Sequence, residues 1–140
     1  MQRYWIAVAH RKQALAAASA GVVAVSHGKE APLRKLSTGD GGIYYAPKSD
    51  FEGETVQAFV ALARVTGADT SERTMPGSPF RPFGRDAESQ KIIETPLRPM
   101  LEDLGFVRSP RHRGMAFLRP FFEIENADYQ HSTAAMGDKA

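Results

Sequence analysis

Two adjacent tyrosines stand beside a proline and a lysine in the string Tyr44-Tyr45-Ala46-Pro47-Lys48. Flat aromatic rings next to cations are the groups with which proteins hold an unstacked nucleobase and its phosphates. In a strand the two rings would face opposite sides, so one would join the core and the other could offer a stacking surface. Aromatic residues in strands also serve simply to pack, and the string alone leaves both interpretations open.

A second string, Ser26-His27-Gly28-Lys29, follows a valine-rich segment and combines a hydroxyl, an imidazole, a flexible backbone and an ammonium group. Gly28 allows the backbone to turn sharply or to approach a ligand closely. Exposed backbone N–H groups together with Lys29 would suit an anion such as a phosphate. The alternative is a solvated turn in which His27 merely ends a strand.

Two further segments, residues 80–86 and 108–114, alternate cations with rings, prolines or glycines. The first contains Phe83 and Arg85, and the second contains His112 and Arg113. An arginine can bind a phosphate with two donors and can also stack on a base. The absence of acidic residues from 108–114 favours binding to a polyanion, with a solvated loop as the alternative.

Catalytic patterns are weak by comparison. The four histidines lack metal-ligand spacing, and Gly39-Asp40-Gly41-Gly42 lacks the Lys-Ser/Thr of a phosphate-binding loop, so it predicts a tight turn. Asp86 and Glu88 would share one face of a strand, where a solvated carboxylate pair is the usual outcome. The chain has no cysteine, which excludes a thiol nucleophile, a disulfide framework and a Cys-type zinc site. We therefore expect no enzyme, no catalytic residue, no metal and no cofactor.

Length and charge give the next expectations. The 140 residues fit one domain, residues 1–140, with a core of its own. The net charge of +2 is unevenly distributed: residues 1–50 and 105–122 each carry +4, whereas residues 51–104 and 123–140 each carry −3. The two basic segments could form one basic face.

Residues 11–25 imitate a signal peptide, because a basic pair precedes an uncharged run. The run is rich in alanine, weakly hydrophobic and shorter than the roughly 20 apolar residues that span a bilayer. We therefore expect a cytoplasmic protein without a membrane partner. The oligomeric state stays open, with a monomer as the simpler expectation.

The elements that position these residues follow from periodicity and from glycine and proline. Strands are expected at residues 4–9, 22–26, 43–46, 56–67, 86–94 and 116–124, and helices at 11–20, 97–104 and 126–136, with one helical turn at 33–36. Residues 70–85 read as irregular. In the long strand, Phe59, Ala61, Ala63 and Val65 are expected on one face. The pattern predicts an α+β fold, a small mixed β-barrel of about six strands with peripheral helices.

The order of these strings resembles the EVE domain family from about Tyr4 to Met136. The resemblance is carried by the strings at residues 4–9, 27–29, 33–40, 44–48, 57–59, 82–86, 97–104, 121–124 and 128–129. It implies a PUA-like fold, related to the YTH, ASCH and PUA domains. Those relatives bind RNA or DNA, several of them by placing a modified base in a pocket walled by aromatic rings.

The resemblance also implies a set of ligand-binding residues. Trp5 and Tyr45 match aromatic residues that could line such a pocket, Ser26, His27 and Lys29 match the loop at its mouth, and Lys48 and Arg85 match cations nearby. One departure concerns Arg111-His112-Arg113-Gly114, where family members often have a tryptophan in place of Arg113. Gly84 stands where the family often has an arginine. With neighbouring residues added, the expected ligand-binding set consists of Trp5, Ser26, His27, Gly28, Lys29, Tyr45, Lys48, Phe83, Arg85, His112 and Arg113.

Two functions remain open at this point. The first is a non-enzymatic module that binds RNA or DNA and recognises a modified nucleobase by stacking, with Lys29, Lys48 and Arg85 on the flanking phosphates. The second is a small-molecule sensor that binds a free nucleoside, a nucleotide or another anionic metabolite in the same pocket.

Overall fold

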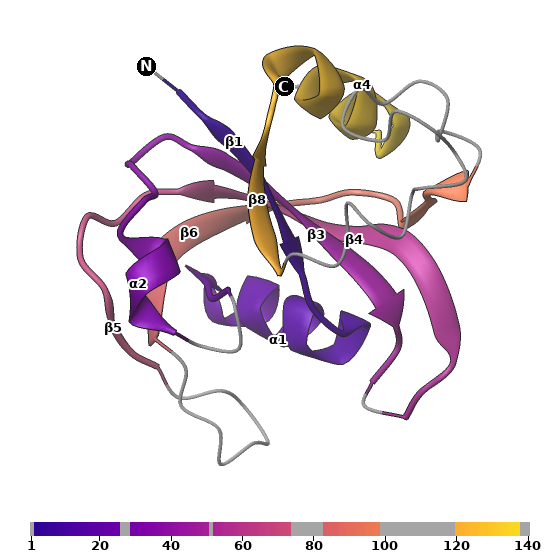
Figure 1. The fold of residues 1–140 in the computed structure, drawn as a ribbon, viewed down its shortest axis with the longest axis horizontal. Helices are drawn as coiled ribbons and strands as arrows, with labels where there is room; N and C mark the ends of the chain where they lie inside the picture. Colours follow the sequence, from indigo (N-terminus) through magenta and orange to yellow (C-terminus); the bar gives the residue numbers. More distant parts are fainter. Residues whose placement is uncertain (1, 26–28, 51, 74–82, 99–119, 138–140) are drawn as a thin grey trace.

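The computed structural model describes residues 2–25, 29–50, 52–73, 83–98 and 120–137. Figure 1 shows a curled sheet between two helices, with α1 below it and α4 above it. The helices of the described residues are not long and apolar enough to cross a membrane. The elements in chain order are β1 Tyr4–Val8, α1 Arg11–Ala20, β2 Val22–Val23, α2 Glu30–Leu33, β3 Gly41–Lys48, β4 Thr55–Val65, β5 Ser71–Glu72, β6 Phe83–Gln90, β7 Thr95–Pro96, β8 Phe121–Ile124 and α4 Asn126–Ala135.

The sheet is mixed, and six strands follow one another in the order β2-β6-β4-β3-β1-β8. The short strands β5 and β7 pair with β6 and β4. The strands β1 and β3 run parallel, and the chain between them passes through α1, β2 and α2, as a parallel connection requires. The prediction of a small mixed β-barrel of about six strands with peripheral helices is confirmed, with the sheet curled into a half-barrel.

Each face of the sheet has its own core. The first core lies between the sheet and α1, and it includes Trp5, Tyr44 and the α1 residues Ala14 and Ala17. The second lies on the α4 side. Strand alternation divides β1 between the two, because Trp5 and Ala7 belong to the first core whereas Ile6 belongs to the second. The second core consists of Ile6, Ile43, Tyr45, Phe59, Leu62, Leu97, Phe122, Ile124, Tyr129 and Met136.

The predicted alternation in β4 is wrong at Phe59. Tyr44 pairs with Ala61 and Tyr45 pairs with Phe59, so Val60 is an extra residue that forms a β-bulge. The bulge turns Phe59 away from the face of Ala61 and into the second core. A second register shift follows between Ala46 and Lys48, beside Gln57, whose φ is +51°. Bulges increase the local bend of a strand, and these two help to curl the sheet.

The other predicted elements agree with the structure or differ from it by a few residues. The helix α1 agrees with the expected residues 11–20, and Gly21 ends it in the left-handed conformation at φ +72°. The helical turn expected at 33–36 lies earlier, at Glu30–Leu33, and Pro32 stands in its first turn, where no backbone donor is needed. The strand β6 begins at Phe83 instead of residue 86. The helix expected at 97–104 falls almost wholly outside the described residues.

Candidate functional site

Three aromatic rings come together on the α1 side of the sheet. In the sheet register, Trp5 of β1 lies beside Gly42 of β3, and Ala7 lies beside both Tyr44 of β3 and Phe121 of β8. Paired residues in neighbouring strands project to the same face of a sheet. Three strands that are distant in the sequence therefore place the rings of Trp5, Tyr44 and Phe121 around one point.

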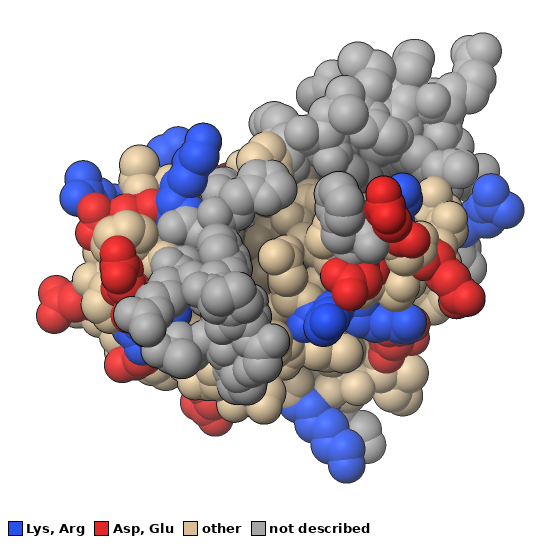
Figure 2. Space-filling model, turned by 90° about the horizontal axis from the view of Figure 1, so that it is seen from below, with Lys and Arg blue, Asp and Glu red and all other residues tan. Residues whose placement is uncertain are grey.

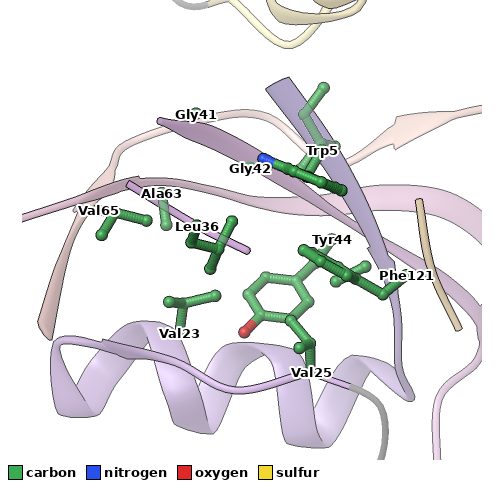
Figure 3. A pocket seen from close by; sticks show the side chains of 12 residues that line it. Trp5, Val23, Val25, Leu36, Gly41, Gly42, Tyr44, Ala63, Val65 and Phe121 are labelled. Atoms are coloured by element: carbon green, nitrogen blue, oxygen red, sulfur yellow. The ribbon is translucent and has the colours of Figure 1, made fainter. Parts of the chain in front are cut away.

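These rings line a small cavity of about 20 Å³. Figure 3 shows the Trp5 ring above that of Tyr44, with Phe121 and Val25 at one side and Leu36 at the other. A volume of this size holds about one water molecule. The lining is almost entirely apolar, and it consists of Trp5, Ala7, Val23, Val25, Leu36, Gly41, Gly42, Ile43, Tyr44, Ala63, Val65 and Phe121.

Neighbours on three sides fix the Trp5 indole, which is only 6% exposed. Its ring stacks on Phe121 with centroids 4.7 Å apart and planes inclined by 8°. The Arg3 guanidinium lies 4.8 Å from the indole centroid, and the indole Nε1 donates a 3.3 Å hydrogen bond to Asp40 Oδ2. The sole tryptophan of the chain is thus held as a rigid wall of the cavity.

The buried carboxylate of Asp40 organises this wall. Its Oδ1 accepts the Arg3 backbone N–H at 3.0 Å, and its Oδ2 accepts the Ser37 backbone N–H at 2.9 Å in addition to the Trp5 indole. Three donors thereby compensate a charge that is only 1% exposed. The tight turn predicted at residues 39–42 lies slightly earlier, because the Asp40 N–H donates to Ser37 O, Gly39 adopts φ +97°, and Gly41 and Gly42 already belong to β3.

The Tyr44 hydroxyl closes the opposite wall. It donates to Ala24 O at 2.9 Å and accepts the Ala24 N–H at 3.0 Å, so it holds the segment after β2 in place. Burial raises the pKa of Tyr44 from 10.0 to about 12, and the hydrogen bond with the Ala24 backbone opposes part of that shift.

This shift gives a pH dependence of stability. Because the pKa of Tyr44 is higher in the folded chain, the neutral phenol contributes fully to the free energy of unfolding below about pH 10. This contribution is lost as the pH rises toward about 12. We expect the free energy of unfolding to fall by roughly 1–3 kcal/mol over this interval. Denaturant titrations at several pH values, compared with Tyr44→Phe, measure it. An equally steep fall in the variant would contradict this origin.

Among the residues expected at the site, Trp5 lines the cavity, whereas Tyr45 does not. Tyr45 belongs to the second core, where its ring meets Phe59 edge-on with centroids 6.1 Å apart. The sequence could not tell which of the two adjacent tyrosines faces the cavity, and the structure assigns that place to Tyr44. Strand alternation explains why Tyr44 lines the cavity and Tyr45 does not, because neighbouring residues in β3 point to opposite faces of the sheet.

Arg85 does not project toward solvent either. It is 4% exposed and donates from Nε and Nη2 to Gly67 O at 3.0 and 2.6 Å, and from Nη1 to the carbonyls of Leu33 and Leu36. This arginine ties α2 and the end of β4 to β6. In the described structure, its guanidinium donates hydrogen bonds to backbone carbonyls and is buried away from solvent.

Two of the expected cations are exposed. Lys29 stands just before α2, Lys48 ends β3, and neither has an ion-pair partner among the described residues. Phe83 is half-buried against the first core. The other predicted residues, Ser26, His27, Gly28, His112 and Arg113, lie outside the described residues.

The surface charge is mixed on the face shown in Figure 2, where Lys and Arg side chains are interspersed with Asp and Glu. Among the described residues, Arg11 forms an ion pair with Glu94, and Lys12 with Asp50. The basic segment 105–122 lies almost entirely outside the described residues, so one continuous basic face stays a prediction. In the described ranges no three His, Asp or Glu side chains gather as a metal site would need.

Sequence reasoning did not place Asp40 and Phe121 at the site, and it chose Tyr45 in place of Tyr44. Asp40 offered one signal, a carboxylate in a glycine turn directly before a strand. Its main target, Trp5, lies 35 residues earlier in the chain. Phe121 was predicted only as part of the last strand, and its place in the cavity depends on the pairing of β8 with β1.

The chain shares its fold with solved YTH domains. The solved YTH domain of Mmi1 in complex with RNA superposes with a TM-score of 0.63 at 12% identity, over 97% of this chain and 78% of that chain. The chain belongs to the EVE domain family, whose sequence model matches residues 3–132. The predicted fold and family are confirmed.

Two curated relatives match over nearly their full lengths. The UPF0310 protein msl3206 of Mesorhizobium japonicum is 36% identical over 139 residues, which cover 98% of this chain and 93% of the relative. The UPF0310 protein YdcG of Bacillus subtilis is 31% identical over 135 residues, which cover 96% and 92%.

Proposed function

We propose that this chain is a non-enzymatic nucleic-acid-binding module that takes one unstacked nucleobase, in a modified form, into the cavity between Trp5, Tyr44 and Phe121. The aromatic lining of this cavity is the observation that carries the proposal. Stacking on such rings contributes about 1–3 kcal/mol per base and accepts either RNA or DNA. The fold supports the proposal, because a domain of the same fold has been solved in complex with RNA.

The cavity must enlarge for this purpose, because a volume of about 20 Å³ does not admit a base ring. Phe121 is the group to move. It is only partly buried, begins β8, and stacks on the indole at 4.7 Å, as a base would. We therefore expect the base to displace Phe121 from Trp5, while Asp40 keeps the indole in place.

Exposed cations a few residues along the chain from cavity residues would hold the flanking phosphates. Lys29 follows the segment that begins after the cavity residue Val25, and its ammonium is exposed. Lys48 is a second exposed cation on the strand of Tyr44. The predicted ligand-binding residues Ser26, His27, Gly28, His112 and Arg113 belong to this proposal. Such contacts make affinity fall with salt, because each phosphate contact releases counterions.

Filling the cavity provides the test. Gly42 lines it, and a Cβ added at Gly42 meets no heavy atom within 4 Å, so a larger side chain has room to enter. We expect Gly42→Leu to weaken binding of a modified-base oligonucleotide by about five- to hundred-fold, the loss of one stacked base. Fluorescence anisotropy titrations of modified and unmodified RNA and DNA at several salt concentrations measure it.

Gly42→Ala is the matched control, because its Cβ meets no heavy atom within 4 Å and its methyl group reaches much less far than a leucine side chain. Its affinity should stay close to that of the unaltered chain. If Gly42→Leu and Gly42→Ala bind the oligonucleotide equally well, the cavity does not hold the base. Absence of oligonucleotide binding at low salt would overturn the function itself.

The mixed surface charge supports a second candidate, a sensor for a free nucleoside or nucleotide. A ligand of that size needs the cavity but no extended basic track. Thermal unfolding with added nucleosides distinguishes the two functions, because a ligand that binds only the folded chain raises the melting temperature. Stabilisation by a free nucleoside that equals the effect of an oligonucleotide would favour the sensor.

A further inference from the structure

An exposed ion pair stands at the edge of the cavity wall. Arg3 Nη2 lies 2.7 Å from Glu123 Oε1, and Arg3 Nε donates to Glu123 Oε2 at 3.2 Å. In the sheet register, Glu123 of β8 lies directly opposite Trp5 of β1. The ion pair therefore joins the residue directly before β1 to β8, and these two strands carry two rings of the cavity, Trp5 and Phe121.

We propose that the Arg3 guanidinium is a phosphate-binding site, and that in the free chain the Glu123 carboxylate fills the place that a ligand's phosphate takes. The ligand phosphate is that of a nucleotide whose base enters the neighbouring cavity, so the inference rests on the proposed function. Nothing covalent changes in this exchange: one anion replaces another on the same pair of N–H donors.

The geometry of the pair fits this exchange. Two nitrogens of one guanidinium face two oxygens of one carboxylate, which is the fork arrangement that an arginine also presents to a phosphate. The ring of Trp5 holds the guanidinium at 4.8 Å from its centroid, so the fork is already oriented before a ligand arrives. A lysine at this position would offer a point charge without that orientation.

Exposure makes the carboxylate replaceable. The Arg3 and Glu123 side chains are each 44% exposed, and an ion pair of that kind contributes little to stability. The hydrogen bond with Glu123 raises the pKa of Arg3 above its usual value, and the charge of the nearby Asp40 adds to this effect. The two Asp40 oxygens are already engaged by three N–H donors. Asp40 is thus a fixed negative charge behind the site, and Glu123 is the exchangeable one.

The chain offers a matched control. Arg11 and Glu94 form another exposed pair, with Nη1 at 3.0 Å from Oε1 and side chains 36% and 43% exposed. Neither residue lines the cavity. Glu94→Gln removes the same charge from the protein as Glu123→Gln does, so a difference between the two variants reports the position and not the net charge.

The experiment measures oligonucleotide affinity and its salt dependence for Glu123→Gln, Glu94→Gln, Arg3→Gln and the double variant Arg3→Gln/Glu123→Gln. We expect Glu123→Gln to bind about two- to five-fold more tightly than Glu94→Gln, because the phosphate no longer competes with a carboxylate. Arg3→Gln should bind more weakly, with a salt slope lower by about one. In the double variant the gain from Glu123→Gln should vanish.

Each outcome decides a separate point. Equal affinities of Glu123→Gln and Glu94→Gln, or a gain that persists without Arg3, would overturn the phosphate site while leaving the proposed function in place. Absence of binding in the unaltered chain and in Glu123→Gln would overturn both. A gain confined to a nucleoside monophosphate would keep the site and assign its phosphate to a free nucleotide. Thermal melts of all variants, with Arg3→Lys as a milder change, identify any loss of folding.

Discussion

Replacement of Arg85 by methionine is expected to lower the free energy of unfolding by about 2–4 kcal/mol, because buried carbonyl groups lose their donors. The guanidinium contacts Gly67 O twice, and it also reaches the carbonyls of Leu33 and Leu36 at the end of α2. A methionine fills much of the same volume but donates nothing. This is a large part of the roughly 5–15 kcal/mol that stabilises an ordinary domain.

Denaturant titration of Arg85→Met, Arg85→Lys and Arg34→Met measures this effect. Arg34 is the matched control, because its side chain is 69% exposed and paired only with Glu30 in the same segment. We expect Arg34→Met to lower the free energy of unfolding by less than about 1 kcal/mol. Arg85→Lys should lower it nearly as much as Arg85→Met does, since one ammonium cannot reach both the α2 carbonyl and the Gly67 carbonyl. A fully stable Arg85→Met would contradict the structural role.

The same variants separate two roles of Arg85. The family resemblance implies a cation near the ligand, whereas the structure places the guanidinium among carbonyls at 4% exposure. At a temperature where Arg85→Met is folded, we expect its oligonucleotide affinity to equal that of the unaltered chain. A loss of affinity with full stability would return Arg85 to the binding surface.

Replacement of Asp40 by asparagine is expected to lower the free energy of unfolding by about 2–3 kcal/mol and to shift the Trp5 emission to longer wavelength. The two carboxylate oxygens accept the backbone N–H groups of Arg3 and Ser37 and the indole N–H of Trp5. In asparagine one oxygen becomes an NH₂ group that points at a donor. The indole then loses its hydrogen bond or the turn opens, and either change exposes the ring.

Tryptophan fluorescence is a specific readout because Trp5 is the only tryptophan. Asp69→Asn is the control, since Asp69 is exposed and its replacement removes the same charge. We expect Asp69→Asn to leave both the emission and the stability unchanged. Unaltered emission in Asp40→Asn would show that the carboxylate does not orient the indole, and then its effect on base binding should also be absent.

Local sequence determined the parts of this fold that depend on neighbouring residues. The helix α1 follows from its alanine-rich composition and from Gly21, and both ends agree with the prediction. The segments β1, β3 and β4 are apolar and were recognised, although β3 extends further at both ends. Tyr44 and Tyr45 were identified as the pair from which a cavity ring and a core ring would come.

The rest depends on contacts between distant residues. Alternation cannot say which tyrosine faces α1, because that depends on the register of β3 with β1. A bulge at Val60 reverses the face of Phe59 without any glycine to signal it. The arginine at position 85 is buried only because α2 and the end of β4 bring their carbonyls to it. Each of these features belongs to the packing and not to a local pattern.

The position of β1 between β3 and β8 has a consequence for synthesis of the chain. The partners of Trp5 include Asp40 early in the sequence and Phe121 near its end. Contacts of such long separation form late, so a ribosome must complete almost the whole chain before the cavity can close. Until β8 emerges, β1 presents an unpaired hydrophobic edge, the kind of surface on which nascent chains aggregate. A chain that terminates before Phe121 is therefore expected to aggregate, and not to fold into a protein with lower affinity.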